Sequence, residues 1–182
     1  MKQILFVQGG GKGAHDEWDD KLVDSLKRAL GSGCNLHYPH MPNEADPSYA
    51  SWKAALTEEI AALDDSATLV GHSIGGTILI ALLAEEDLLH KPTAVFLVAA
   101  PYIGQGGWPS DEIAPMTDLG SHFPKGLPIH LYHGDTDETV PFAHLGLYAK
   151  AIPQATVRRL KGRDHQLNDD MSEVARDIMR LG

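Results

Sequence analysis

The sequence predicts an α/β fold, a three-layer sandwich in which about six mostly parallel strands form a doubly wound sheet with helices on both faces. Two observations predict this architecture. Short apolar segments alternate along the chain with segments whose apolar residues recur at helical spacing. The apolar run at 93–99 is not interrupted by polar residues, which indicates a strand buried on both faces. Because 182 residues suit one core, we expect residues 1–182 to form a single domain.

The expected strands are 3–7, 34–38, 68–70, 93–99, 127–132 and 156–160, the last of which is more polar and suits a sheet edge. The expected helices are 16–30, 49–63, 73 to about Leu89, 142–152 and 171–181. Gly31 ends the first helix, and Pro47 lies in the first turn of the second. Residues 101–126 are rich in Gly and Pro, and we expect a lid-like excursion there that lines the substrate site with Tyr102 and Trp108.

The segment Gly71-His72-Ser73-Ile74-Gly75 joins the third strand to the third helix through a G-x-S-x-G motif. A chance match in a chain of this composition is expected roughly 0.1 times, so the motif gains weight from its strand–turn–helix context. Glycines at both ends allow a sharp turn that exposes the Ser73 hydroxyl and directs the Ile74 N–H toward a developing oxyanion. The alternative is an ordinary turn that happens to contain a serine.

A serine nucleophile needs a base whose pKa is near neutrality and a fixed anion behind that base. His165 is our candidate base, because it follows the last strand in a glycine-containing loop. Loops that follow parallel strands gather at one edge of the sheet, so this loop should meet Ser73. Asp135 and Asp137 both stand in the turn after the fifth strand, and Asp164 is a third candidate acid. His72 adjoins Ser73, but its side chain should point away from the hydroxyl.

The first strand is followed by a glycine-rich loop, Gly9-Gly10-Gly11-Lys12-Gly13-Ala14. A phosphate-binding loop requires Ser or Thr after the lysine, and this loop has Gly13 there. The looser dinucleotide pattern G-x-G-x-x-A is satisfied, but the next strand does not end in the acidic residue that the pattern expects. We therefore favour a turn that brings backbone N–H groups close to a substrate oxygen, and we expect His15 beside it to help shape the substrate pocket.

The bulk composition excludes several classes of partner. The net charge of −10 argues against nucleic acid and anionic membranes. Apolar runs fall short of the ~20 residues of a membrane span, and the start of the chain does not suit a signal peptide. The single cysteine, Cys34, permits no internal disulfide, which suits a reducing compartment, so we expect a cytoplasmic protein. We expect Cys34 itself to be a small core residue. His37 and His40 lack acidic partners at ligand spacing, and we expect no metal or cofactor.

The order Ser, Asp, His and the three loops that carry them resemble the α/β-hydrolase superfamily over almost the whole chain. The segment 133–141, His-Gly-Asp-Thr-Asp-Glu-Thr-Val-Pro, resembles that superfamily's H-G-x-x-D-x-x-V-P segment. This resemblance implies that the acid is Asp137 rather than Asp135. The short chain, without two leading strands and a cap domain, is similar to the compact hydrolases related to the retinoblastoma-binding serine hydrolase, and Trp18 fits that likeness. That family often has His-Gly where this chain has Gln8-Gly9, which leaves Gly10 and Gly11 as candidates for the second oxyanion donor.

These observations predict a serine hydrolase of acyl groups, a carboxylesterase that acts on small soluble esters. Ser73 would attack the carbonyl carbon, His165 would move the proton, and Asp137 would orient the imidazole. The N–H groups of Ile74 and of the glycine-rich loop would hold the oxyanion. The alternative is a protein-interaction module that has the same fold and little or no turnover.

Overall fold

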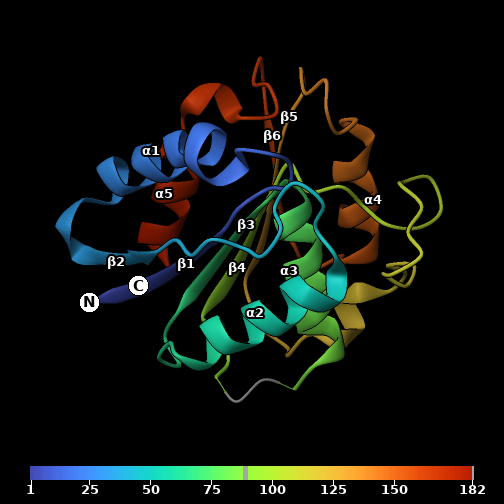
Figure 1. The fold of residues 1–182 in the computed structure, drawn as a ribbon, viewed down its shortest axis with the longest axis horizontal. Coiled ribbons are helices and arrows are strands. Elements are labelled where there is room, and N and C mark those ends of the chain that lie inside the picture. The colour runs from blue at the N-terminus through green and yellow to red at the C-terminus, as the bar shows by residue number, and fades with distance from the viewer. Residues whose placement is uncertain (88–89, 182) are drawn as a thin grey trace.

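The computed structural model describes residues 1–87 and 90–181 and confirms the predicted three-layer α/β architecture (Figure 1). The strands are β1 (Lys2–Val7), β2 (Cys34–His37), β3 (Thr68–His72), β4 (Ala94–Val98), β5 (Ile129–Gly134) and β6 (Thr156–Leu160). They form one sheet in the order β2-β1-β3-β4-β5-β6, and every neighbouring pair is parallel. The carboxyl ends of all these strands therefore meet at one edge of the sheet.

Helices cover both faces of this sheet (Figure 1). The α-helices are α1 (Asp20–Leu30), α2 (Tyr49–Ala61), α3 (Ser73–Glu85), α4 (Ala143–Ala151) and α5 (Ser172–Arg180). Short 3₁₀ turns occur at Gly31–Gly33, Leu119–His122 and Leu167–Asp169. Helices α1 and α5 lie on one face of the sheet, and α2, α3 and α4 lie on the other.

The core consists of two apolar layers, one on each face of the sheet. Successive strand residues point to opposite faces, so Ile4 and Phe6 pack with α1 and α5, whereas Leu5 packs with α2 and α3. All three side chains are fully buried. Two-sided burial explains why the inner strands read as uninterrupted apolar runs, and each large side chain buried in this way contributes roughly 1.5–3 kcal/mol.

The largest differences from the predicted helix boundaries are at the start of α1 and at the end of α3. The expected helix at 16–30 begins instead with a π-helical turn at Ala14–Asp19, which leads into α1 and leaves Asp19 buried. Helix α3 ends at Glu85, because Glu86 adopts an extended backbone. The predicted end of that helix at Leu89 lies outside the described residues.

The segment 101–126 packs beside α3 and α4. Its apolar side chains, among them Ile103, Ile113 and Phe123, are buried in the layer that these helices form. Among the described residues, those that line the cavity at Ser73 all come from other segments. The apolar residues that suggested a substrate-lining loop serve to bury this excursion against the helices.

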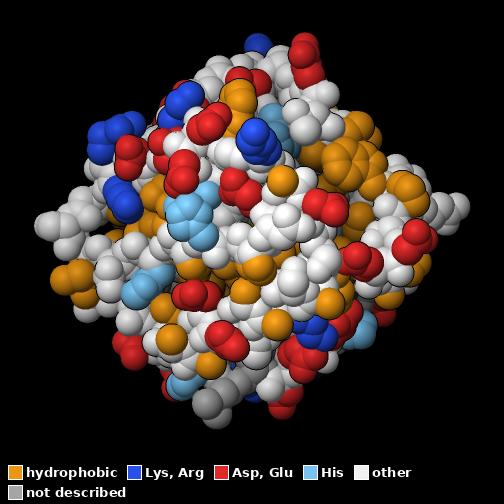
Figure 2. Space-filling view, in the orientation of Figure 1, with side chains coloured by type: hydrophobic (Ala, Val, Ile, Leu, Met, Phe, Trp, Pro, Cys, Tyr) orange, Lys and Arg blue, Asp and Glu red, His pale blue; other side chains and the backbone are white. Residues whose placement is uncertain are grey.

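Two further properties concern the surface and the helices. On the face of the molecule shown in Figure 2, acidic side chains are scattered among other residues rather than gathered in one area. Within the described ranges, 1–87 and 90–181, no helix has both the length and the apolar character that crossing a membrane requires.

Candidate active site

Ser73 occupies a strained turn between β3 and α3. Its φ is +51°, in the left-handed region that non-glycine residues rarely adopt. Both glycines of the motif are needed here. A Cβ at Gly71 would lie 2.5 Å from the Cα of Gly76, and one at Gly75 would overlap the carbonyl oxygen of Gln8. The motif therefore forms the sharp strand-to-helix turn that the sequence predicts.

Three loops at the carboxyl edge of the sheet bring Ser73, His165 and Asp137 together. The Nε2 atom of His165 lies 3.1 Å from Oγ of Ser73, and its Nδ1 atom lies 2.8 Å from Oδ2 of Asp137. The other carboxylate oxygen, Oδ1, accepts the backbone N–H groups of Thr139 and Val140, each at 2.8 Å. Asp137 Oδ2 thus accepts the Nδ1–H of His165, which leaves the Nε2 lone pair facing the serine hydroxyl.

Electrostatics around the imidazole favour this protonation state. Burial would raise the pKa of the Asp137 carboxyl, but hydrogen bonds from His133, His165 and the Val140 backbone outweigh burial and lower that pKa. Burial lowers the pKa of the His165 imidazole, and Asp137 offsets part of the decrease. A neutral imidazole beside a carboxylate is therefore the favoured state near neutral pH, and it can accept a proton.

The two other candidate acids lie elsewhere. Asp135 accepts the N–H of Gly162 at 2.6 Å and pairs with Arg159 at 3.2 Å. Asp164 accepts the N–H of Asn168 at 2.8 Å. Each has partners of its own, so the geometry favours Asp137 as the acid behind His165.

Internal acceptors already occupy most N–H groups of the glycine-rich loop. The carbonyl oxygen of Glu44 accepts the N–H of Gly11 at 2.6 Å, and its carboxylate accepts the N–H groups of Gly13 and His15 at 2.8 and 3.0 Å. Gly11 is therefore wrong as an oxyanion donor. Because a side-chain carboxylate already binds these N–H groups, the loop also lacks the free anion-binding surface that a nucleotide site needs.

Gly10 fits the oxyanion position better. Its N–H has no acceptor among the described residues. A Cβ on Gly10 would lie 2.9 Å from Cγ2 of Ile74, so the two residues are immediate neighbours. The N–H of Ile74 belongs to the first turn of α3, where intrahelical acceptors are missing. Both N–H groups are thus left for a ligand oxygen near Ser73.

A cavity of about 300 Å³ opens beside Ser73. It is lined by the glycine-rich loop, by the π-helical turn before α1, by the turn at Ser73 and by the loops after β5 and β6: Gly9, Gly10, Gly11, Lys12, Ala14, Trp18, Asp19, His72, Ser73, Thr139, His165 and Gln166. Sequence reasoning did not assign Lys12, Trp18, Thr139 or Gln166 to the pocket. Each lies in or just after a segment that the sequence places near the carboxyl ends of the strands. Their positions along the chain could therefore have indicated that they line the pocket.

The three predicted substrate-binding side chains are not among the residues that line this cavity. The ring of His15 stacks on the rings of Tyr38 and His40, with centroids 3.9 and 3.5 Å away. Tyr102 is buried, and its hydroxyl donates to the carbonyl oxygen of Met116 at 2.7 Å. Trp108 lies edge-on against the ring of His144, at 5.7 Å between centroids. Contacts with Tyr38, His40, Met116 and His144, rather than with Ser73, fix these three side chains.

His15, Asp16 and His40 form a group of potential metal ligands whose donor atoms lie within 4.8 Å of one another. The sequence did not show this group, because Asp16 and His40 are distant along the chain. The two imidazole rings stack with an angle of 23° between their planes. A cation in the plane of one ring would lie off the plane of the other, so a hydrogen bond of 2.7 Å between His15 Nδ1 and Asp16 Oδ1 accounts for their contact better than a metal does.

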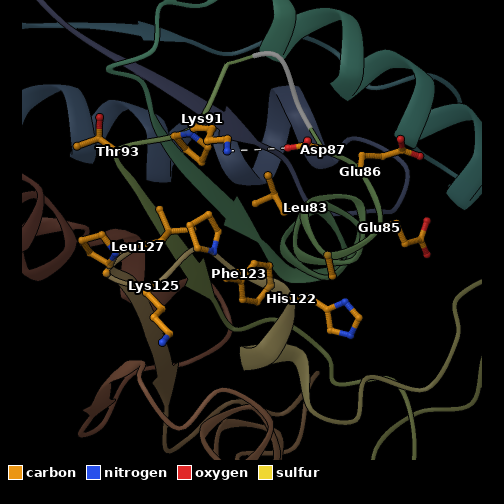
Figure 3. A pocket seen from close by; sticks show the side chains of 15 residues that line it. Leu83, Glu85, Glu86, Asp87, Lys91, Thr93, His122, Phe123, Lys125 and Leu127 are labelled. Atoms are coloured by element: carbon orange, nitrogen blue, oxygen red, sulfur yellow. Dashed lines mark ion pairs between the residues drawn. The ribbon is translucent and has the colours of Figure 1, made fainter.

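A larger cavity, of about 740 Å³, lies at the opposite edge of the sheet (Figure 3). Residues just before β4 and β5, including Thr93 and Leu127, form part of its wall, and Lys91 faces Asp87 at 4.0 Å. The strands begin at this edge of the sheet, whereas Ser73 follows the carboxyl end of β3. The larger cavity is therefore remote from the Ser73 hydroxyl, and we place the candidate chemistry in the smaller one.

Comparison with known families identifies the class of protein that the fold and this site define. The family model described as serine hydrolase matches residues 5–170, and the chain belongs to that family. The resemblance to compact α/β hydrolases is thereby confirmed. No curated protein matches the sequence.

Solved structures share the fold at low sequence identity. The YdeN gene product from B. subtilis superposes with a TM-score of 0.78 and 18% identity, covering 100% of this chain and 98% of its own. The esterase domain of a Rhodothermus marinus protein has a TM-score of 0.70 and 19% identity, with 100% and 88% covered. XC6422 from Xanthomonas campestris, described as an α/β serine hydrolase without lid, has a TM-score of 0.65 and 16% identity, with 99% and 80% covered.

Proposed function

We propose that this serine hydrolase is a carboxylesterase that cleaves small acyl esters through an acyl-enzyme on Ser73. The observation that carries the proposal is the continuous hydrogen-bonded series from Asp137 through His165 to the Ser73 hydroxyl. The esterase domain from Rhodothermus marinus, which shares the fold, supports the choice of ester chemistry.

The reaction follows from the geometry. As the Ser73 oxygen attacks the ester carbonyl, its proton passes to Nε2 of His165, and Asp137 stabilises the imidazolium that forms. The carbonyl oxygen becomes an oxyanion, which the N–H groups of Gly10 and Ile74 would bind. The imidazolium then protonates the departing alkoxide, and a water molecule activated by His165 releases the acid from Ser73.

The size of the cavity supports small substrates. Its volume of about 300 Å³ is at the lower end of the range for ligand pockets, roughly 300–1,000 Å³. A short acyl chain fits such a space, whereas a long chain would have to extend into solvent. The exposed Trp18 side chain offers an apolar surface at its rim.

Hydrolysis of p-nitrophenyl acetate, butyrate and octanoate tests the proposal. We expect a burst of p-nitrophenol equal to the enzyme concentration and the highest kcat/KM for the short acyl chains. Ser73→Ala should show neither burst nor turnover. If the folded wild-type protein hydrolyses none of these esters faster than Ser73→Ala, the proposal is wrong, and the alternative of an interaction module is favoured.

A further inference from the structure

His72 stands next to Ser73 in the sequence, but its side chain turns into the interior. Its Nδ1 atom lies 2.9 Å from Oδ2 of Asp19, and its Nε2 atom lies 3.0 Å from the backbone carbonyl oxygen of His165. The side chains of His72 and Asp19 are each 1% exposed. The prediction that His72 points away from the serine hydroxyl agrees with this arrangement, but the partners that it finds were not foreseen.

The partners of His72 determine its charge. Both ring nitrogens face an oxygen that can only accept, so both contacts are hydrogen bonds only when both nitrogens carry a proton. Burial by itself would lower the pKa of His72, but the Asp19 carboxylate outweighs burial and raises it. Burial would likewise raise the pKa of Asp19, and His72 reverses this. The two residues therefore form a buried ion pair of imidazolium and carboxylate.

This ion pair joins three parts of the candidate site. Oδ2 of Asp19 also accepts the N–H of Gly9 at 2.6 Å, which ties the glycine-rich loop to the ion pair. The π-helical turn before α1 supplies Asp19, and β3 supplies His72. Through its Nε2–H, His72 holds the main chain of the loop that carries His165.

We propose that His72 and Asp19 are positioning residues, and that their buried ion pair holds the backbone of His165 so that its imidazole stays aligned with Ser73. The inference rests on the proposed hydrolase function. The carbonyl oxygen of His165 lies on the same residue as the imidazole, so a shift of this loop moves the base directly. Misplacement of a catalytic group by about 1 Å can reduce a rate by about 10²-fold.

The ion pair also acts on the charge of His165. The groups that face this imidazole are Asp137 from the loop after β5, His72 from β3 and Asp19 from the turn before α1. The rings of His72 and His165 lie 4.9 Å apart between centroids. A positive charge on His72 disfavours a second one on His165, and this effect exceeds the opposite effect of Asp19. The pair thus keeps the base neutral to lower pH.

The test compares His72→Gln and Asp19→Asn with the wild type in p-nitrophenyl acetate hydrolysis across pH. We expect kcat to fall about 10- to 100-fold in His72→Gln, with little change in KM. The acid limb of kcat/KM should move to higher pH in both variants, because His72→Gln removes the cation and Asp19→Asn removes the carboxylate that keeps the buried His72 protonated.

His130→Gln is the matched control, because His130 is a buried histidine of β5 that makes no contact with the site residues. It should keep both kcat and the position of the acid limb. Histidine ¹⁵N spectra of the wild type measure the charge of each imidazole without a kinetic readout. We expect both nitrogens of one histidine, assigned to His72 by its absence in His72→Gln, to stay protonated at pH values where His165 is neutral.

The outcomes separate the two proposals. If the wild type hydrolyses the ester while His72→Gln and Asp19→Asn share its kcat and its acid limb, the positioning role is wrong and the hydrolase function stands. A neutral His72 in the wild-type spectra likewise overturns the ion pair. If the folded wild type itself lacks turnover, the proposed function has failed rather than the positioning.

Discussion

Asp137→Asn keeps the size of the side chain but replaces one carboxylate oxygen by an amide nitrogen. The structure determines where that nitrogen goes. Oδ1 of Asp137 accepts two backbone N–H groups, those of Thr139 and Val140, so an amide oxygen must remain there. The amide NH₂ is then forced to face Nδ1 of His165. Two donors cannot share a hydrogen bond, so His165 adopts the tautomer with the proton on Nε2.

The wrong tautomer removes the base rather than weakening it. An Nε2–H cannot accept the proton of the Ser73 hydroxyl, which lies 3.1 Å away. In a serine protease triad, the corresponding exchange of aspartate for asparagine lowers kcat by about 10⁴-fold. We expect a loss of that order here, with KM changed far less because Asp137 does not line the cavity.

Steady-state hydrolysis of p-nitrophenyl acetate at pH 8 measures this loss, with circular dichroism as a check that the variant is folded. Asp135→Asn is the matched control, because Asp135 stands in the same turn but pairs with Arg159 and Gly162. Its kcat should stay close to that of the wild type. The reasoning is refuted if Asp137→Asn retains kcat within about tenfold, or if Asp135→Asn suffers the larger loss.

Three further predictions concern pH, packing and the glycine-rich loop. Catalysis requires the neutral form of His165, and burial lowers the pKa of this imidazole from 6.5. The acid limb of wild-type kcat/KM should therefore lie below pH 6.5. A limb above that value would contradict the assignment. Gly75→Ala places a Cβ against the Gln8 carbonyl and should lower the free energy of unfolding in urea by about 3 kcal/mol or more, whereas an unchanged midpoint would rule out the tight turn. Glu44→Gln removes an acceptor from the loop N–H groups and should lower the free energy of unfolding by about 1–3 kcal/mol in the same assay; an unchanged midpoint would contradict the role of Glu44 in holding the loop.

The parallel sheet and the placement of Ser73 and His165 in loops at the carboxyl ends of its strands could be predicted from the sequence because they follow from local patterns. Apolar runs define the strands, and parallel winding places the loops after them at one edge. The choice between Asp135 and Asp137 needed more. It depended on resemblance to a known segment, since both residues occupy the same turn and only the backbone path decides which carboxylate reaches His165.

Contacts between loops could not be predicted in this way. Gly11 loses its N–H to Glu44, a residue of another loop, and no periodicity reports such a pairing. Tyr102 and Trp108 are aromatic, as pocket-lining residues often are, but their rings pack against Tyr148 and His144 of α4. The buried ion pair of Asp19 with His72 depends on a π-helical turn that the apolar spacing of the first helix does not reveal.

Labelling with a fluorophosphonate probe, followed by mass spectrometry of the digested protein, tests the activation of Ser73 most directly. We predict a single adduct on the wild type, located on the peptide that contains Ser73, and strongly slowed labelling in His165→Gln. A folded wild-type protein that takes up no probe, or takes it up on another residue, would contradict the assignment of Ser73 as an activated nucleophile.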